Sequence, residues 1–337
     1  MDRRRLLALL AGATLAPAFD AGAAPAGVPA SPGSAPEAAA PGGAAPDAAA
    51  PGAAAPSDAD APALRLAAAW RGLATDGVQH VGAIEIDWAA RAVRIASAEP
   101  VPSRAHGLSA EPDGGWLAMA FRPGTWLWRF DARGRPVARA SLDDEGHGRR
   151  FSGHVIASAD GTRLFTAEYD ARTTEGRIGV RDRRTLRKLD EWPTGGTDPH
   201  QLTLAPDGRL VVANGGLLRR PDGEKRDVDR MDPSLAALDP DSGRLLERWQ
   251  LRDRRLGLRH LAWGTGADGA PLLGVALQAD HDAPVRRAQA PVLATWDGET
   301  LDVPSRATEG AGYAGDIAPA AGGFVLTCQL AKCALHW

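Results

Sequence analysis

Residues 200–213 read His-Gln-Leu-Thr-Leu-Ala-Pro-Asp-Gly-Arg-Leu-Val-Val-Ala, and this stretch decides the fold class. A histidine opens a short apolar segment, the dipeptide Asp207-Gly208 follows, and a second apolar segment comes after it. Asp-Gly between two apolar segments of strand length is a strong hairpin signal, because both residues tolerate the backbone angles of a tight turn. The stretch therefore predicts two antiparallel strands joined by a short turn.

The same pattern recurs along the chain. It begins again at His106, His154 and His260, in each case before Asp-Gly and a second apolar segment, and the histidines are 46–60 residues apart. A fifth copy begins at Asp316, with aspartate where the others have histidine. Two more strand-like segments follow each hairpin, and four antiparallel strands per repeat form one blade of a β-propeller. In the first complete unit these segments are Thr125–Asp131 and Pro136–Leu142.

We therefore predict an all-β protein, a β-propeller of four-stranded antiparallel blades. A β-sandwich is the alternative, but a sandwich would not explain the repeat. Residues 64–101 and 313–337 each supply about three further strands, and propellers commonly close by pairing strands from both chain ends in one blade. We expect six or seven blades, of which six fit the length best, with an incomplete closing blade.

The first 63 residues carry two other signals. Residues 1–19 read as an export signal: Arg3-Arg4 and Arg5 precede the apolar segment Leu6–Ala18, and Ala-x-Ala cleavage motifs follow. The adjacent arginines resemble a twin-arginine signal, which exports folded proteins; an ordinary secretory signal is the alternative. Residues 20–63 are almost only Ala, Pro, Gly, Ser and Asp, so we expect a disordered linker. The propeller would then span residues 64–337, in the periplasm.

The composition excludes several classes of protein. Lys and Arg total 39 against 42 Asp and Glu, a net charge of −3, so we expect no nucleic-acid partner. No apolar run reaches about 18 residues, so we expect no transmembrane segment. Two cysteines, Cys328 and Cys333, are too few for a disulfide scaffold or a four-cysteine zinc site. They are expected to form one disulfide across a hairpin in an oxidising compartment, with two unpaired thiols as the alternative.

Three stretches resemble a known family. They are Ser152–Val155 with Ala167–Asp170 and Gly176–Val180, Gly195–Leu202, and Val211–Gly216 with Met231–Leu235. Together they resemble an uncharacterised periplasmic β-propeller family, the domain of unknown function fifteen-thirteen, related to the quinoprotein amine dehydrogenase β-chain-like propellers. The resemblance covers about residues 70–335. Family members carry twin-arginine-like leaders and are commonly encoded beside imelysin-type iron-uptake proteins. The resemblance thus implies a role in iron acquisition with imelysin-type partners, and no established reaction.

The repeated histidines are the main candidates for a site. Equivalent positions in successive blades point the same way, so four histidines are expected to ring one mouth of the central channel: His106, His154, His200 and His260. Imidazole is a common ligand of zinc, copper and iron, so the ring predicts a site for a metal or a metal chelate, with iron or copper as candidates. Glu168 and Asn214, near the ends of second strands, are expected to add oxygen ligands. The structural alternative is that each histidine hydrogen-bonds its turn aspartate or a neighbouring blade.

Three functions remain open on these grounds. The favoured one is an exported, non-enzymatic protein that binds a partner or a metal-containing ligand. The second is a metal-dependent or redox enzyme using the histidines, which an export route for folded proteins would suit. The third is a purely structural interaction scaffold. The mixed-charge run Arg219–Arg230 is expected to be an exposed loop suited to docking.

Overall fold

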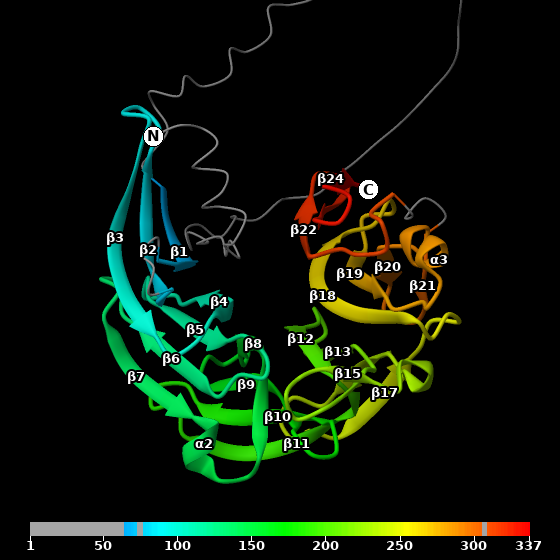
Figure 1. Cartoon of the computed structure of the whole chain (residues 1–337), viewed down its shortest axis with the longest axis horizontal. Coiled ribbons are helices and arrows are strands. Elements are labelled where there is room, and N and C mark those ends of the chain that lie inside the picture. Colours follow the sequence, from blue (N-terminus) through cyan, green and yellow to red (C-terminus); the bar gives the residue numbers. More distant parts are fainter. Residues whose placement is uncertain (1–63, 73–76, 305–308) are drawn as a thin grey trace, which may run out of the picture.

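The chain forms an all-β propeller. The computed structural model describes residues 64–72, 77–304 and 309–337. Within these residues, six antiparallel sheets follow one another around an axis, as Figure 1 shows. This confirms the predicted fold class and the preferred number of blades. The expected export signal (residues 1–19) and linker (residues 20–63) lie outside the described residues.

Each sheet starts with its innermost strand and proceeds outward in chain order (Figure 1). The first sheet consists of β1 (Leu64–Arg71), β2 (Gln79–Asp87) and β3 (Ala92–Val101). The second consists of β4 (Ala105–Ala110), β5 (Trp116–Ala120), β6 (Trp126–Phe130) and β7 (Pro136–Ser141). The third consists of β8 (Arg149–Ala157), β9 (Arg163–Asp170), β10 (Glu175–Asp182) and β11 (Lys188–Thr197). The fourth sheet consists of β12 (Pro199–Leu204), β13 (Leu210–Asn214), β16 (Ser234–Leu238) and β17 (Leu245–Trp249). The fifth consists of β18 (Leu256–Thr265), β19 (Pro271–Ala279), β20 (Leu293–Trp296) and β21 (Leu301–Asp302). The sixth consists of β22 (Asp316–Ala320), β23 (Gly323–Cys328) and β24 (Cys333–His336).

Short elements connect these strands. They are α2 (Leu142–Glu145), the hairpin β14 (Leu218–Arg219) with β15 (Lys225–Arg226), the 3₁₀ helix η1 (Val228–Arg230) and α3 (Pro284–Ala288). No helix in the described part of the chain is long and apolar enough to cross a membrane.

The aspartate of each repeat holds its own turn. Its carboxylate accepts a hydrogen bond from the amide two residues further on: Gly115 N to Asp113 at 3.0 Å, Thr162 N to Asp160 at 3.1 Å, Arg209 N to Asp207 at 3.1 Å and Ala270 N to Asp268 at 3.0 Å. This is the usual way in which aspartate stabilises a tight turn. The recurrence of Asp-Gly six to eight residues after each histidine therefore follows from the hairpin and needs no bond between the two side chains.

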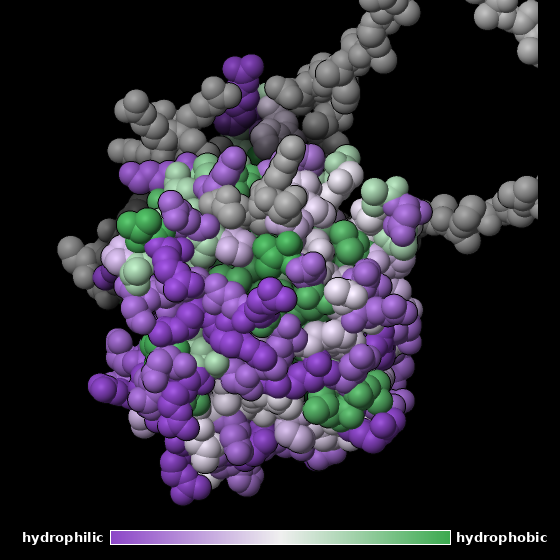
Figure 2. All heavy atoms as spheres, turned by 90° about the vertical axis from the view of Figure 1, so that its right-hand side faces the viewer, coloured by the Kyte–Doolittle hydropathy of each residue, from purple (hydrophilic) through white to green (hydrophobic). Residues whose placement is uncertain are grey.

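Apolar side chains fill the space between successive sheets. Each of five clusters joins one sheet to the next; Val81 and Trp116 meet between the first and second sheets, and Val211 and Trp296 between the fourth and fifth. The outer surface shown in Figure 2 is mostly hydrophilic, with small apolar areas scattered over it. The blades are thus held by burial of apolar surface between their faces.

The two terminal sheets have three strands each and lie at the two ends of the arc in Figure 1. No strand pairing joins β1–β3 to β22–β24 within the described ranges, so the expected blade built from both chain ends is wrong for these residues. The reason is local: β2 and β3, like β22 and β23, are joined by short turns. Closing a short loop costs less entropy than bringing together distant ends of the chain.

Four innermost strands share one irregularity, a β-bulge. In β18, Leu258 pairs with Leu277 and Leu261 pairs with Val275, which leaves Arg259 and His260 opposite a single residue. Leu258 and Leu261 both lie in the same apolar cluster, although they are three positions apart. The two residues between them therefore lie on the other side of the strand, toward the axis. A bulge re-aims side chains in this way.

The other three histidines lie at the same feature. The pairing register shifts between Ala105 and Leu108 in β4, between Phe151 and Val155 in β8, and between Pro199 and Leu202 in β12. Each interval contains the histidine of its repeat. β22 begins with Asp316 and pairs with β23 without a shift. The bulge is therefore repeated in the four histidine-bearing blades.

Gly153 permits the close approach of the first two histidines, and its replacement tests this. Its φ is +112°, and a Cβ there would lie 2.4 Å from Cδ2 of His106. We expect Gly153→Ala to lower the free energy of unfolding by about 3 kcal/mol in urea titrations, because backbone strain and overpacking add. Gly208→Ala is the control: its φ is +91° but no atom lies within 4 Å, so a loss of about 1 kcal/mol is expected from strain alone. Equal losses would contradict the close packing.

Candidate functional site

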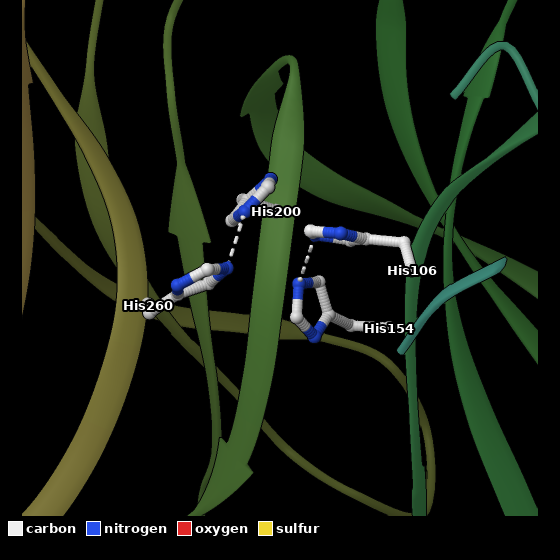
Figure 3. Close-up of side chains that lie close together, drawn as sticks. All are labelled: His106, His154, His200 and His260. Atoms are coloured by element: carbon white, nitrogen blue, oxygen red, sulfur yellow. Dashed lines mark hydrogen bonds between the residues drawn. The ribbon is translucent and has the colours of Figure 1, made fainter. Parts of the chain in front are cut away.

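The structure brings the four repeated histidines together. Figure 3 shows their rings pointing toward one another from β4, β8, β12 and β18. One nitrogen from each of the four rings lies within 4.8 Å of all the others. His200 and His260 are buried, whereas His106 and His154 are half-buried. We call this group, His106, His154, His200 and His260, the histidine cluster.

The cluster consists of two contacting pairs. Nε2 of His154 lies 3.1 Å from Nε2 of His106, and Nε2 of His200 lies 2.8 Å from Nε2 of His260 (Figure 3). Each pair joins neighbouring blades. Gln201 reinforces the second pair, because its Oε1 accepts a hydrogen bond of 2.9 Å from the backbone amide of Leu261, at the bulge of the next blade. The bulges and this bond fix where the imidazoles meet.

The tautomers of the second pair follow from Arg122. Its guanidinium donates to Nδ1 of His200, and a guanidinium has no acceptor. A neutral His200 must then carry its hydrogen on Nε2 and donate it to Nε2 of His260. His260 in turn carries its hydrogen on Nδ1, which lies 3.2 Å from Oδ1 of Asp316 in a geometry that does not make a hydrogen bond. The aspartate of the fifth repeat thus lies beside the histidine of the fourth.

Arg122 belongs to a buried ionic group behind His200. Its guanidinium also donates to Oδ1 of Asp198, and Nε of Arg219 donates to the same oxygen at 2.7 Å. Burial alone would raise the pKa of Asp198, but the two arginines outweigh it and hold that pKa below its ordinary value. Burial lowers the pKa of Arg122 to about 9 despite Asp198, so Arg122 is still charged at neutral pH.

Arg219 corrects one sequence expectation. The run Arg219–Arg230 is expected to be an exposed loop, and its residues after Arg219 are exposed or half-buried, but Arg219 itself is buried, with 9% of its surface exposed, and bonded to Asp198. The run instead contains the end of β14, all of β15 and η1. Arg219 points inward and is the second cation that bonds the buried carboxylate of Asp198.

Three histidines of the cluster have lowered pKa values, which favours their neutral form. Burial is the main cause that lowers the pKa of His106, His154 and His200 well below the ordinary value of 6.5. The charges of Arg122 and Arg259 lower all three further. A neutral imidazole keeps one nitrogen lone pair free of a proton, which is the state that a metal ion requires.

Glu168 and Asn214 do not join the cluster. Glu168 is fully buried in an ionic group, 2.8 Å from Nη2 of Arg181 and 2.9 Å from Nζ of Lys188. The amide nitrogen of Asn214 bonds the carbonyl of Thr194 at 3.3 Å. The structure therefore places both residues in contacts that hold strands together, while their suggested role as oxygen ligands stays a prediction.

The two cysteines are free thiols on directly paired positions of β23 and β24. Cys328 is buried and Cys333 is exposed. Burial, together with the neighbouring Cys333, raises the pKa of the Cys328 thiol to about 11. The disulfide stays a prediction, and the cross-strand pairing is the arrangement that it would require.

Sequence reasoning missed the charged residues around the cluster. Arg122 lies in the connection between β5 and β6, Asp198 precedes His200 by two residues, and Arg259 precedes His260 directly. None of them recurs in the other repeats. Only the position of Arg259 beside a repeated histidine could have singled it out.

Glu168 offers a test of its structural role. Removing one charge of a buried ion pair leaves the other charges uncompensated, so we expect Glu168→Gln to lower the free energy of unfolding by about 3 kcal/mol. Glu175→Gln, which removes an exposed partner of Arg177, should cost less than about 1 kcal/mol. Urea titrations measure both. A stability unchanged by Glu168→Gln would contradict the role assigned here.

The neutral histidines predict a pH dependence of stability. Their pKa values are lower in the folded chain than the unfolded value of 6.5, so the unfolded state binds more protons below pH 6.5. The stabilisation that comes from keeping these histidines neutral is therefore fully present above pH 6.5. As the pH falls below 6.5, the free energy of unfolding decreases by up to about 1.4 kcal/mol per pH unit for each histidine. Urea titrations of metal-free protein between pH 7 and 5 should show this loss.

A variant isolates the contribution of one histidine. His154→Gln should reduce the pH dependence of the free energy of unfolding by the contribution of one histidine. His147→Gln, at an exposed position, should leave this pH dependence unchanged. A wild-type slope in His154→Gln would contradict the assignment.

Comparison with solved structures supports the fold. Hydrazine synthase of Kuenenia stuttgartiensis is 15% identical over 75% of this chain and 71% of that chain, with a TM-score of 0.52. The Cps50 (Swd1) β-propeller domain of Myceliophteria thermophila is 13% identical over 78% of this chain and 89% of that chain, with a TM-score of 0.42. At 15% identity, the similarity to hydrazine synthase shows a common fold and nothing about function. The TM-score of 0.42 for the Cps50 domain is too low for any conclusion.

A search of curated proteins finds no match. The profile of one protein family, described as "Protein of unknown function (DUF1513)", matches residues 99–337. That range includes all four members of the histidine cluster and the ionic group around Asp198. Because the match covers well over half of the sequence, this chain belongs to the DUF1513 family.

Proposed function

We propose that this protein binds a transition-metal ion at the histidine cluster. The observation that carries the proposal is the convergence of four imidazoles, one from each of four successive blades, with a ligand nitrogen from each within 4.8 Å of the rest. Four bulges at equivalent places are needed to achieve it. Irregularities of this kind are common beside functional sites.

The distances suit a shared metal ion. A metal–nitrogen distance of about 2.0–2.1 Å places two ligands about 2.9 Å apart at a right angle and about 3.3 Å apart at a tetrahedral angle. The two contacting pairs are separated by 3.1 Å and 2.8 Å. The widest of the other separations, 4.8 Å, requires only small ring movements to reach a common ion.

A purely structural role explains the cluster less well. A hydrogen bond that links two neighbouring blades needs one donor and one acceptor, and a single pair of histidines supplies both. Four half-buried or buried imidazoles give up hydration for few hydrogen bonds, which costs free energy. The turn aspartates bond amides of their own turns, and no bond is seen between them and His154, His200 or His260. A bound ion would compensate the cost.

The ligand set favours particular metals. Neutral imidazoles suit copper, zinc and ferrous iron, and copper(II) binds most tightly among divalent first-row ions. Ferric iron prefers charged oxygen ligands, so an iron-binding role would involve Fe²⁺. Coordination by Nε2 of His200 would move its hydrogen to Nδ1. Arg122 would then withdraw from His200 and remain bonded to Asp198.

The cellular role is proposed on other grounds. The basic and apolar N-terminal sequence supports export by a twin-arginine-like signal and a periplasmic location. The family resemblance supports a non-enzymatic accessory role in iron acquisition, with imelysin-type proteins as partners. Fractionation of cells that express the full chain tests export: replacing Arg3 and Arg4 by Lys should retain the protein in the cytoplasm, and unchanged export would reject the twin-arginine route.

Metal binding can be tested directly on the full chain. We expect purified protein to bind about one equivalent of Cu²⁺ in calorimetric titration, and His154→Gln or His200→Gln to weaken binding about 100-fold or more, because each removes a direct ligand. His281→Gln is the matched control, since His281 is buried but bonds Asp253 outside the cluster. Circular dichroism verifies that each variant is folded.

Two results would reject the proposal. One is a folded wild type that binds none of Cu²⁺, Zn²⁺ and anaerobic Fe²⁺. The other is a folded His154→Gln or His200→Gln variant that binds Cu²⁺ as tightly as the wild type does.

A further inference from the structure

The charges around the histidine cluster are unbalanced. Four arginines lie near enough to influence it or its ionic group: Arg104, Arg122, Arg219 and Arg259. Among the described residues, Asp198 pairs with Arg122 and Arg219, and Asp316 lies beside His260. Asp280 also acts on Arg219 and Arg259, but it is bonded to Lys225, which offsets its charge. The neutral histidines add no negative charge. Binding a divalent cation here would increase an excess of positive charge that already exists.

Two of the four arginines lack a carboxylate partner among the described residues: the exposed Arg104 and the half-buried Arg259. Arg122 and Arg219 share Asp198, whereas the side chain of Arg259 makes no hydrogen bond and no ion pair with any residue of the described ranges. Burial lowers the pKa of Arg259 below its ordinary value, and Asp198 only partly offsets this. A half-buried guanidinium whose donors lack protein partners loses part of its hydration, and a bound ligand would compensate this cost.

The bulge in β18 places Arg259 beside the cluster. Arg259 and His260 both lie between Leu258 and Leu261, whose side chains face the apolar core. Arg259 therefore lies on the side of the strand that faces the axis, as His260 does. Its charge acts on His106, His154 and His200, and it is the largest charge effect on His200.

A second unsatisfied group lies at the bulge of β8, two blades away from β18. The hydroxyl of Ser152 is fully buried and has no hydrogen-bond partner among the described residues. Ser152 lies two residues before His154, within the shifted interval of β8. Buried polar groups are usually bonded, so this one also indicates a polar guest near the axis.

We propose that the histidine cluster binds its metal ion together with an anion, and that Arg259 holds this anion beside the metal. The inference rests on the proposed metal site and names its ligand class: a metal ion that carries an anionic ligand. The anion would neutralise part of the excess charge and use the free donors of Arg259.

Azide is a suitable probe, because it binds an open position of copper(II) and produces a charge-transfer band in visible light. We expect copper-loaded wild type to bind azide, and Arg259→Gln to weaken azide binding about tenfold or more, because one nearby positive charge is lost. Arg259→Lys keeps the charge and should restore part of the affinity. Arg287→Gln, on the exposed helix α3, is the control and should bind azide as the wild type does.

The outcomes separate the two proposals. Copper bound by the histidines, with azide affinity equal in wild type and Arg259→Gln, would overturn the anion site and leave the metal site standing. Copper bound by the histidines without any azide binding would do the same. Protein that binds neither copper nor azide would overturn both. Azide bound by a protein that takes up no copper, detected by calorimetry and lost in Arg259→Gln, would support the anion site and reject the metal site.

Discussion

The β-bulge on each of four innermost strands is the constraint on which the proposed site depends. In a regular strand, side chains alternate between faces, so a histidine between two core-facing leucines could not share its face with the residue beside it. The bulge in β18 breaks this alternation, keeps Leu258 and Leu261 in the core, and directs Arg259 and His260 toward the axis. Repeated in four blades, the same distortion makes four imidazoles meet in a molecule that otherwise holds together through apolar packing between sheets.

The fold and the histidines were accessible from the sequence because both repeat. Asp-Gly turns and alternating apolar segments specify hairpins locally, and recurrence at blade length specifies a propeller. Strand limits predicted in this way, such as Thr125–Asp131, agree with β6 (Trp126–Phe130) to within one residue. Equivalence between blades then placed His106, His154, His200 and His260 together. The expected blade built from both chain ends was wrong for the described part of the chain, where no strand pairing joins the two terminal sheets.

The charged environment could not be predicted, because it depends on contacts between distant positions that do not repeat. Arg122 bonds Asp198 and His200, which lie more than seventy residues further along the chain. Arg219 begins a run of charged residues that looks solvent-exposed in the sequence, yet it bonds the same aspartate. Glu168 had the right chemistry for a ligand, yet Arg181 and Lys188 lie on neighbouring strands and bind it. Sequence reveals the donor atoms but not which charges surround them, and those charges decide whether a bare cation or a metal with its anion is the better ligand.

X-ray absorption spectroscopy at the copper edge, on the full chain loaded with one equivalent of Cu²⁺, tests the central claim most directly. The account predicts imidazole nitrogens at about 2.0 Å as the main ligands, with the multiple scattering that imidazole rings produce, and loss of one imidazole in His154→Gln. A spectrum dominated by oxygen ligands, or one identical in wild type and His154→Gln, would contradict it, because copper would then be bound away from the converging bulges.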